Sequence, residues 1–191
     1  MLRFLSRLLF LGLLALLAAC ATPSPRYAVP AVERQALRQF QIEGRFSLRQ
    51  ENNSYSGKLS WHHGPEGDDI FLMNPFGQGV AQINRRPGAA RLLTADQKEY
   101  LAADADQLVA DVLGYSLPVA GMAEWLLARA SSGGTARRDA QGRLLQLQEA
   151  GWDIDYDYGD TPDPQALPLR LTARRGAELE LKLRIDDWSA Q

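Results

Sequence analysis

Few side chains in this sequence of 191 residues have types and spacings suited to chemistry. Cys20 is the only cysteine, so a single thiol is available for covalent modification. His62 and His63 are the only histidines, and neighbours on a strand point to opposite faces, which makes them a poor metal pair. We interpret both as surface histidines in a turn at a strand end.

Asp153, Asp155 and Asp157 have the alternate spacing of a calcium-binding loop. An EF-hand loop that began at Asp153 would need glycine at its sixth position and glutamate at its twelfth, but Tyr158 and Pro164 stand there. Strand alternation explains the three carboxylates as the solvent-facing side of a strand. The sequence also lacks G-x-S-x-G, G-x-G-x-x-G and Walker motifs. We therefore expect no catalytic residue, no metal and no cofactor, and a protein that is not an enzyme.

Cys20 follows a segment with the features of a secretory signal. Arg3 and Arg7 give it a positive start, and Leu8–Leu17 is an apolar core too short to span a membrane. With Leu17-Ala18-Ala19 before the cysteine, the segment resembles the bacterial lipobox. In such signals the thiol receives a diacylglyceryl group, the peptide is cut before the cysteine, and the new amine is usually acylated, as with palmitate. The resemblance implies a signal peptide at 1–19, whereas a cleavable signal with an incidental cysteine is the alternative.

The rest of the chain divides into a tether and one domain. Residues 21–30 contain three prolines and no periodicity, which predicts a lipid-anchored tether at 20–30 before a domain at 31–191. The net charge of −2 becomes −4 once Arg3 and Arg7 leave with the signal. That charge excludes a polybasic nucleic-acid binder, so we expect no nucleic acid as a partner. An anionic domain must also rely on its lipid anchor to stay at an acidic membrane surface.

Alternation of apolar and polar residues predicts a domain made mainly of antiparallel strands. Phe40–Leu48 and Ser54–Trp61 alternate most clearly, and the turn at Glu51-Asn52-Asn53 should join them into a hairpin. Further strands are expected at 68–73, 80–83, 90–93, 99–102, 143–148, 152–158, 167–171 and 179–185.

Two helices should interrupt these strands, and a short helix is expected before them at residues 31–39. Asp104 can cap the first helix and Gly114 suits its end. Apolar residues at 122–126 mark one side of the second.

These elements predict an α+β domain that is mostly β, with ten or eleven antiparallel strands curled into a sandwich or barrel. A barrel of that strand number is wide enough to hold a ligand, and the helices could cover one mouth as a lid. Close packing of the inward side chains into a solid core is the alternative. The candidates for a cavity wall are Phe46, Leu48, Leu59, Trp61, Leu72, Leu108, Val112, Trp125, Trp152, Ile154, Tyr156 and Leu181.

The segment Asn74-Pro75-Phe76-Gly77 predicts a tight turn with an aromatic ring at its tip. The ring of Phe76 could fold back onto the core. Alternatively, Pro75, Phe76 and Gly77 form a probe that dips into a membrane or a partner.

Several of these pieces together resemble the LolB family, the outer-membrane lipoprotein receptors of Gram-negative bacteria. They occur in the family's order and span nearly the whole mature chain. Phe76 is a departure, because leucine is more usual there, but a large apolar tip is kept. The matching pieces are the lipobox at Cys20, the strands Ile42–Arg45 and Ser56–Trp61, the loop Asn74–Gly77, and the segments Leu117–Trp125 and Leu183–Trp188.

The resemblance implies an unclosed antiparallel β-barrel of about 11 strands, lined with apolar side chains and lidded by helices. It implies a monomeric receptor at the cell outer membrane, lipid-anchored and facing the periplasm. Its partners would be the periplasmic carrier LolA, acylated lipoproteins as cargo, and outer-membrane lipid. The cargo's acyl chains would enter the cavity from LolA and leave into the inner leaflet of the outer membrane.

Two other functions compete with this interpretation. A structural or assembly lipoprotein would have a solid β core that docks on a protein partner. A lipid-anchored hydrolase would need polar side chains clustered in a pocket, whereas the alternation places most of them on the solvent face.

Overall fold

Eleven antiparallel strands form one continuous sheet in the computed structural model, which describes residues 34–51 and 53–190. The expected signal peptide at 1–19 and the expected tether at 20–30, which includes Cys20, lie outside these residues. The strands are β1 (Phe40–Gln50), β2 (Asn53–Gly64), β3 (Gly67–Met73), β4 (Gly79–Arg86), β5 (Ala89–Thr94), β6 (Glu99–Ala102), β7 (Thr135–Arg138), β8 (Leu144–Glu149), β9 (Trp152–Asp157), β10 (Arg170–Arg175) and β11 (Leu179–Ala190).

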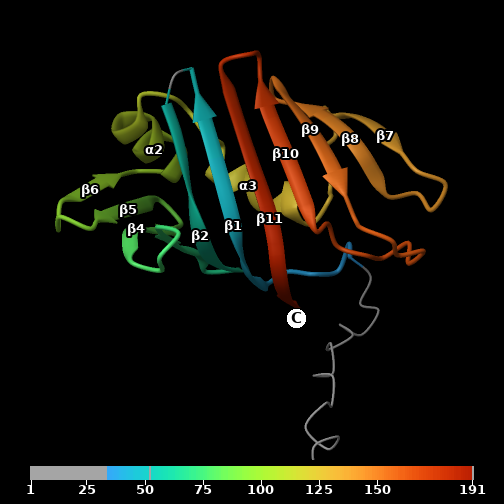
Figure 1. Cartoon of the computed structure of the whole chain (residues 1–191), viewed down its shortest axis with the longest axis horizontal. Coiled ribbons are helices and arrows are strands. Elements are labelled where there is room, and N and C mark those ends of the chain that lie inside the picture. The colour runs from blue at the N-terminus through green and yellow to red at the C-terminus, as the bar shows by residue number, and fades with distance from the viewer. Residues whose placement is uncertain (1–33, 52, 191) are drawn as a thin grey trace, which may run out of the picture.

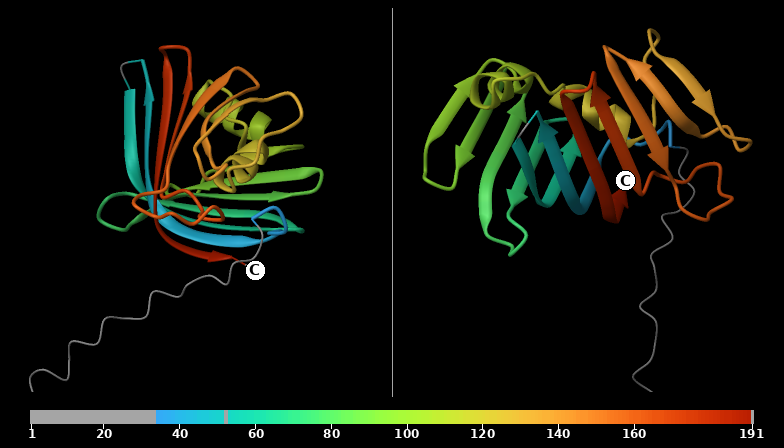
Figure 2. Two further views of the ribbon diagram at one scale, coloured as in Figure 1. Left: turned by 90° about the vertical axis from the view of Figure 1, so that its right-hand side faces the viewer. Right: turned by 45° about the horizontal axis from the view of Figure 1, so that its top comes forward.

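The sheet is an unclosed barrel. The strand order is β6-β5-β4-β3-β2-β1-β11-β10-β9-β8-β7, so β1 and β11 pair in the centre and β6 and β7 form the two edges. Figure 1 shows the connection from β6 to β7 running across one face of the sheet. It carries α2 (Ala105–Leu113) and α3 (Val119–Leu126), which lie inside the curve of the strands (Figure 2). The expected mostly β, α+β fold with a helical lid is confirmed.

The sheet owes its curvature partly to two glycines in its central strands. A Cβ on Gly44 would lie 2.3 Å from the carbonyl oxygen of Arg184, and one on Gly57 would lie 2.0 Å from that of Met73. Any larger residue would push the neighbouring strand away. The register of β1 against β11 also shifts at Gly44, as it does at a β-bulge, and bulges bend strands.

Both helices have the local signals that the sequence predicts. The carboxylate of Asp104 accepts a hydrogen bond of 2.7 Å from the backbone N–H of Gln107. Gly114 ends α2 with a φ of 80°, and its N–H donates to Ala110. Because the cap satisfies an otherwise free backbone donor and glycine tolerates positive φ, α2 begins and ends where the sequence indicates.

The expected helix at 31–39 is wrong for the described part of that segment. Residues 34–36 form a turn and residues 37–39 have no regular structure. The guanidinium of Arg129, just after α3, donates to the carbonyl oxygens of Arg34 and Leu37 at 2.6 Å each. The segment's carbonyls therefore bond to a distant side chain, and a tertiary contact overrides the local helical preference.

Strand bounds differ from the expected ones where periodicity is weak. The strand β7 has no predicted counterpart because its four residues, Thr-Ala-Arg-Arg, are all exposed and show no alternation. Leu167 and Leu169 lie in the loop before β10, although they continue its spacing of apolar residues. The prediction fails in both places because apolar residues alternate reliably with polar ones only along a half-buried strand, and neither the edge strand β7 nor the loop before β10 is one.

Candidate functional site

An apolar cavity of about 120 Å³ lies between the concave face of the sheet and the two helices. Every side chain around it is apolar, and the wall combines strands β1 to β4 and β11 with α2, α3 and the segment between them. The lining residues are Phe46, Leu48, Leu59, Trp61, Ile70, Leu72, Ile83, Val109, Leu113, Leu117, Val119, Met122, Leu181 and Leu183.

The sheet side of this wall follows from strand alternation. Leu48, Leu59 and Trp61 are buried, whereas the residues between them on the same strands face outward. The cross-strand register brings Leu59 opposite Leu72 and Trp61 opposite Ile70, which in turn lies opposite Ile83. The inward side chains of β2, β3 and β4 therefore share one surface.

The helix side of the wall uses a different face of α2 from the one expected. Val109 and Leu113, one turn apart, line the cavity. Leu108 is buried in the surrounding core, and Val112 is half-buried outside the cavity. The apolar stripe on α2 includes Val109 and Leu113 as well as Leu108 and Val112. The position in which the helix packs on the sheet decides which of these two pairs lines the cavity.

The twelve candidate cavity residues separate into two groups. Phe46, Leu48, Leu59, Trp61, Leu72 and Leu181 line the cavity, whereas Leu108, Val112, Trp125, Trp152, Ile154 and Tyr156 do not. Trp125 and Trp152 contact each other, with ring centroids 5.7 Å apart, and Ile154 and Tyr156 are buried on the same strand as Trp152. The β9 side of the interior therefore belongs to the packed core.

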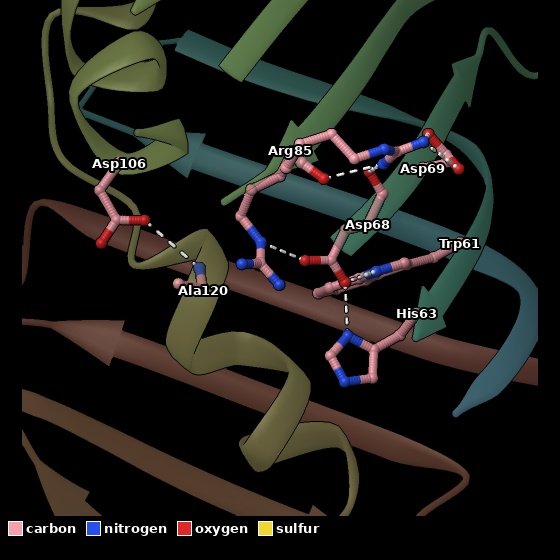
Figure 3. A network of polar contacts seen from close by, with 8 residues as sticks. Trp61, His63, Asp68, Asp69, Arg85, Asp106 and Ala120 are labelled. Atoms are coloured by element: carbon pink, nitrogen blue, oxygen red, sulfur yellow. Dashed lines mark hydrogen bonds and ion pairs between the residues drawn. The ribbon is translucent and has the colours of Figure 1, made fainter. Parts of the chain in front are cut away.

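A buried carboxylate fixes the tryptophan of the cavity wall (Figure 3). The indole N–H of Trp61 donates to Asp68 at 2.9 Å, and Asp68 is fully buried. His63 Nδ1 lies 2.6 Å from the same carboxylate, and the guanidinium of Arg85 donates to its other oxygen. Burial raises the pKa of Asp68, but the hydrogen bonds from His63, Trp61 and Arg85 outweigh it and hold that pKa below 3.8.

The interpretation of both histidines as surface residues in a turn is right about the exposure of His62, but it is wrong about that of His63 and about the turn. His62 and His63 lie within β2, and only His62 is exposed. The register pairs His63 with Asp68 across the β2–β3 hairpin, and its ring stacks on Phe40 with centroids 4.9 Å apart. Because neighbouring residues on a strand point to opposite faces, one of the two histidines must point inward. The sequence does not show that Asp68 lies opposite that histidine on the next strand.

A second contact joins the two helices of the lid. The carboxylate of Asp106, in the first turn of α2, accepts a hydrogen bond of 3.3 Å from the backbone N–H of Ala120 at the start of α3 (Figure 3). This side chain satisfies one of the free donors at a helix N-terminus. This hydrogen bond thus links the N-terminal end of α2 to the N-terminal end of α3.

The loop between β3 and β4 presents a single exposed ring. Phe76 is 91% exposed, and the loop projects beyond the strands that carry it (Figure 2). The side-chain oxygen of Asn74 accepts from the backbone N–H of Phe76 at 3.0 Å and of Gln78 at 3.1 Å. Gly77 adopts a φ of 89° and donates to the backbone of Asn74 at 2.9 Å. These hydrogen bonds fix the backbone of the loop in a conformation that keeps the ring of Phe76 exposed to solvent.

Sequence reasoning missed two apolar neighbours of this loop. Phe71 on β3 and Val80 on β4 are 41% and 37% exposed, and both point to the outer face beside the loop. Their sequence signal is a break in the alternation of polar and apolar residues, because Phe71 and Val80 occupy positions at which each strand should present a polar side chain to water.

The described part of the chain offers little else for chemistry. Residues 34–51 and 53–190 contain no group of three or more His, Cys, Asp or Glu side chains that could hold a metal ion. Asp153 and Asp155 hydrogen-bond with Gln148 and Gln146 on the outer face, as alternation predicts. No helix in the same residues is long and apolar enough to cross a membrane.

The fold and the site define a class of protein: a curved, unclosed β-sheet that encloses an apolar cavity beneath a helical lid and carries an exposed aromatic loop. A family model described as "Outer membrane lipoprotein LolB" matches residues 38–188. The chain therefore belongs to the LolB family of outer-membrane lipoproteins.

Relatives in three bacteria match nearly the full length of the chain, and each is called outer-membrane lipoprotein LolB. The one from Dechloromonas aromatica is 43% identical, over 91% of this chain and 92% of its own. The one from an Azoarcus species is 39% identical, over 91% and 90%. The one from Pseudomonas savastanoi is 33% identical, over 97% and 96%.

Proposed function

We propose that the protein is a lipid-anchored receptor of the outer membrane that faces the periplasm. It accepts lipoproteins from the periplasmic carrier LolA, holds their acyl chains in its apolar cavity and inserts them into the inner leaflet of the outer membrane. Family membership supports a part in lipoprotein localisation. The observation that carries the finer proposal is the cavity, whose wall is made of apolar side chains alone.

The chemistry of the cargo explains why such a wall is needed. Each buried methylene of an acyl chain is worth about 0.8 kcal/mol, so exposing two or three chains to water would cost tens of kcal/mol. Free passage through the periplasm is therefore negligible. A protein that accepts these chains needs an apolar enclosure and no covalent step, which agrees with the absence of catalytic motifs from the sequence.

The size of the cavity implies that the lid must move. Sites for small molecules usually measure about 300–1,000 Å³. The cavity is partly open to solvent, and its volume of about 120 Å³ is below that range. We infer that α2 and α3 shift away from the sheet when cargo enters, since packed strands deform less readily than a lid that joins two sheet edges.

The loop and the anchor would act at the membrane. Phe76 is fixed in an exposed position by Asn74, which suits a ring that enters the lipid interface during release. The loop leaves the end of β3 at Met73, whereas the chain enters β1 at Phe40, beside the opposite end of β3. A lipid on Cys20 would hold the receptor at the membrane that Phe76 enters.

The apolar cavity favours this proposal over its two rivals. A structural lipoprotein with a solid β core requires no such enclosure. A hydrolase requires polar side chains in its pocket, and this wall has none that faces the interior.

A transfer assay tests the proposal. Full-length protein in proteoliposomes is mixed with LolA that is loaded with an acylated lipoprotein, and the lipoprotein is followed from the soluble to the vesicle fraction. Transfer should require the protein, and vesicles without it are the control. Equal transfer with and without the protein would refute the receptor function.

A further inference from the structure

A groove of about 650 Å³ runs along the outer face of the sheet, at the foot of the loop that carries Phe76. Its size falls within the range of small-molecule sites, about 300–1,000 Å³. Pro75 and Met73 form an apolar side, and four charged residues stand around it: Glu43, Arg45, Lys58 and Asp186. These charged side chains point away from the interior, so the groove opens on the outer face, and Phe46 lies between it and the apolar cavity and lines both.

Two of the four charges neutralise each other. Arg45 donates to both carboxylate oxygens of Asp186, at 2.9 and 3.1 Å, in a two-point ion pair across β1 and β11. Such a fork-to-fork contact fixes both side chains. The groove therefore has one cation and one anion left for a ligand.

The cation left over is Lys58. None of the ion pairs found in the described part of the chain uses Lys58, whereas Lys98 and Lys182 pair with Asp96 and Glu180 at 2.8 and 2.9 Å. Lys58 stands opposite Arg45 in the register of β1 and β2. Because Arg45 is already paired with Asp186, Lys58 is the cation of the groove that an anionic ligand can pair with.

The anion left over is Glu43. Its carboxylate accepts a hydrogen bond of 2.7 Å from the hydroxyl of Ser60, directly opposite on β2, and that bond holds it in place without neutralising it. Glu43 and Lys58 are thus diagonal neighbours on paired antiparallel strands, which puts them about 7–8 Å apart along the sheet. A fixed carboxylate and a free ammonium at this separation complement a small ligand with both charges.

We propose that this groove binds the phosphoethanolamine headgroup of a membrane phospholipid. Lys58 takes the phosphate, Glu43 takes the ammonium two methylenes away, and the glycerol end rests against Met73 and Pro75. A bilayer lipid fits better than a free metabolite, because Pro75 lines the groove and the next residue, Phe76, is 91% exposed. A ring inserted in the interface would bring headgroups to this depth.

The inference deepens the proposed function, on which it rests, by assigning the lipid that the receptor meets during release. A headgroup held beside the loop would orient the molecule on the bilayer, with the charged groove at headgroup level and Phe76 below it.

Headgroup analogues test the site directly. Full-length protein in micelles of a sugar detergent, which has no phosphate, is titrated with glycerophosphoethanolamine and with glycerol phosphate, and amide shifts at 56–58 and 73–75 are followed by NMR. We expect Lys58→Gln to weaken both ligands by about three- to fivefold, the effect of one exposed charge pair. Glu43→Gln should weaken only glycerophosphoethanolamine, since Gln still accepts from Ser60.

Lys98→Gln, an exposed lysine away from the groove, is the matched control and should change neither affinity. Two results would overturn the site: no shifts at these amides, or inorganic phosphate binding as tightly as glycerophosphoethanolamine with no effect of Glu43→Gln. The second would reveal a plain anion site.

Lipoprotein transfer separates this inference from the proposed function. Wild-type protein that moves lipoprotein into vesicles while the titrations show nothing would refute the headgroup site alone. Failure of the wild type to accept lipoprotein would refute the receptor function. If both hold, the wild type should release lipoprotein faster into phosphatidylethanolamine than into phosphatidylcholine vesicles, because only the ethanolamine ammonium has N–H groups to donate to Glu43. Glu43→Gln should accept lipoprotein normally and lose that preference.

Discussion

At the scale of single residues, two polar side chains position two apolar rings. Asn74 binds the backbone of its own loop and holds Phe76 out in solvent. Asp68, fully buried, holds the indole of Trp61 in the cavity wall. In each case an apolar side chain to which the proposed function assigns lipid contact is positioned by a neighbouring hydrogen-bonding residue.

We predict that Phe76→Glu abolishes insertion and spares acceptance of lipoprotein. A carboxylate at the loop tip would have to be buried in the membrane interface, whereas the loop's hydrogen bonds and the distant cavity are unchanged. The assay separates acceptance from LolA and release into vesicles, and Phe76→Leu, which keeps a large apolar tip, should behave like the wild type. Normal insertion by Phe76→Glu would refute a membrane role for the loop.

We predict that the Asp68 network stabilises the fold above about pH 4. Hydrogen bonds depress the pKa of Asp68 in the folded state, so its contribution is present above the unfolded value of 3.8 and is lost as the pH falls through the folded pKa. Asp68→Asn should lower the free energy of unfolding at pH 7 by about 3 kcal/mol, because Arg85 loses its buried partner.

The difference between Asp68→Asn and the wild type should shrink toward pH 3, which urea unfolding at both pH values would measure. Asp153→Asn, on the exposed outer face, is the control and should change stability little at either pH. An equal loss at both pH values would show that the effect comes from packing.

At the scale of elements, the lid is defined by where it joins the sheet. Its two helices belong to the connection between the edge strands β6 and β7, so they cross the whole concave face. Capping by Asp104 and Gly114 sets the ends of α2, and the link from Asp106 to Ala120 sets its position beside α3. The face that α2 offers to the cavity follows from that docking.

We predict that Val109→Phe impairs acceptance of lipoprotein and that Val112→Phe does not. Val109 lines the cavity, so a larger side chain there would occupy space that an acyl chain needs. Val112 is half-buried on the same helix outside the cavity and offers a matched addition of volume. Overpacking at Val109 should cost about 1–3 kcal/mol of stability, so unfolding is measured beside transfer. Equal transfer by both variants would contradict the assigned cavity.

At the scale of the whole molecule, an open edge distinguishes this sheet from a closed barrel. The strands β6 and β7 do not pair with each other, and the helices bridge the gap between them. The covering is continuous in chain with the sheet only at the two edges, but α3 also packs on β9 through Trp125 and Trp152. The proposed function requires that this covering move while the central strands β1 and β11 stay paired.

We predict that Cys20→Ala removes the lipid anchor and leaves the receptor domain able to bind cargo. Without its thiol the chain cannot receive a diacylglyceryl group, so it should move from the membrane to the soluble periplasmic fraction. Cell fractionation, mass spectrometry of the N-terminal peptide and acceptance of lipoprotein from LolA are the measurements. Loss of acceptance would show that the anchor does more than hold the protein at its membrane.

The sequence by itself determined the elements and their faces. Alternation from Phe40 to Leu48 shows which side chains face inward, the caps at Asp104 and Gly114 bound a helix, and the Asn74–Gly77 turn puts an aromatic at its tip. These signals are local, because each depends on residues a few positions apart.

Only the tertiary structure decided which apolar residues enclose space and which fill it. Trp125 and Trp152 share the apolar spacing of the wall residues but pack against each other, and Val109 replaces Val112 at the cavity. The same holds for His63, whose partner Asp68 is supplied by the next strand. The cavity, the ion network and the outer groove all arise from contacts between segments that are distant in the sequence. The close approach of neighbouring strands at Gly44 and Gly57 is also a tertiary contact, and no local sequence pattern encodes it.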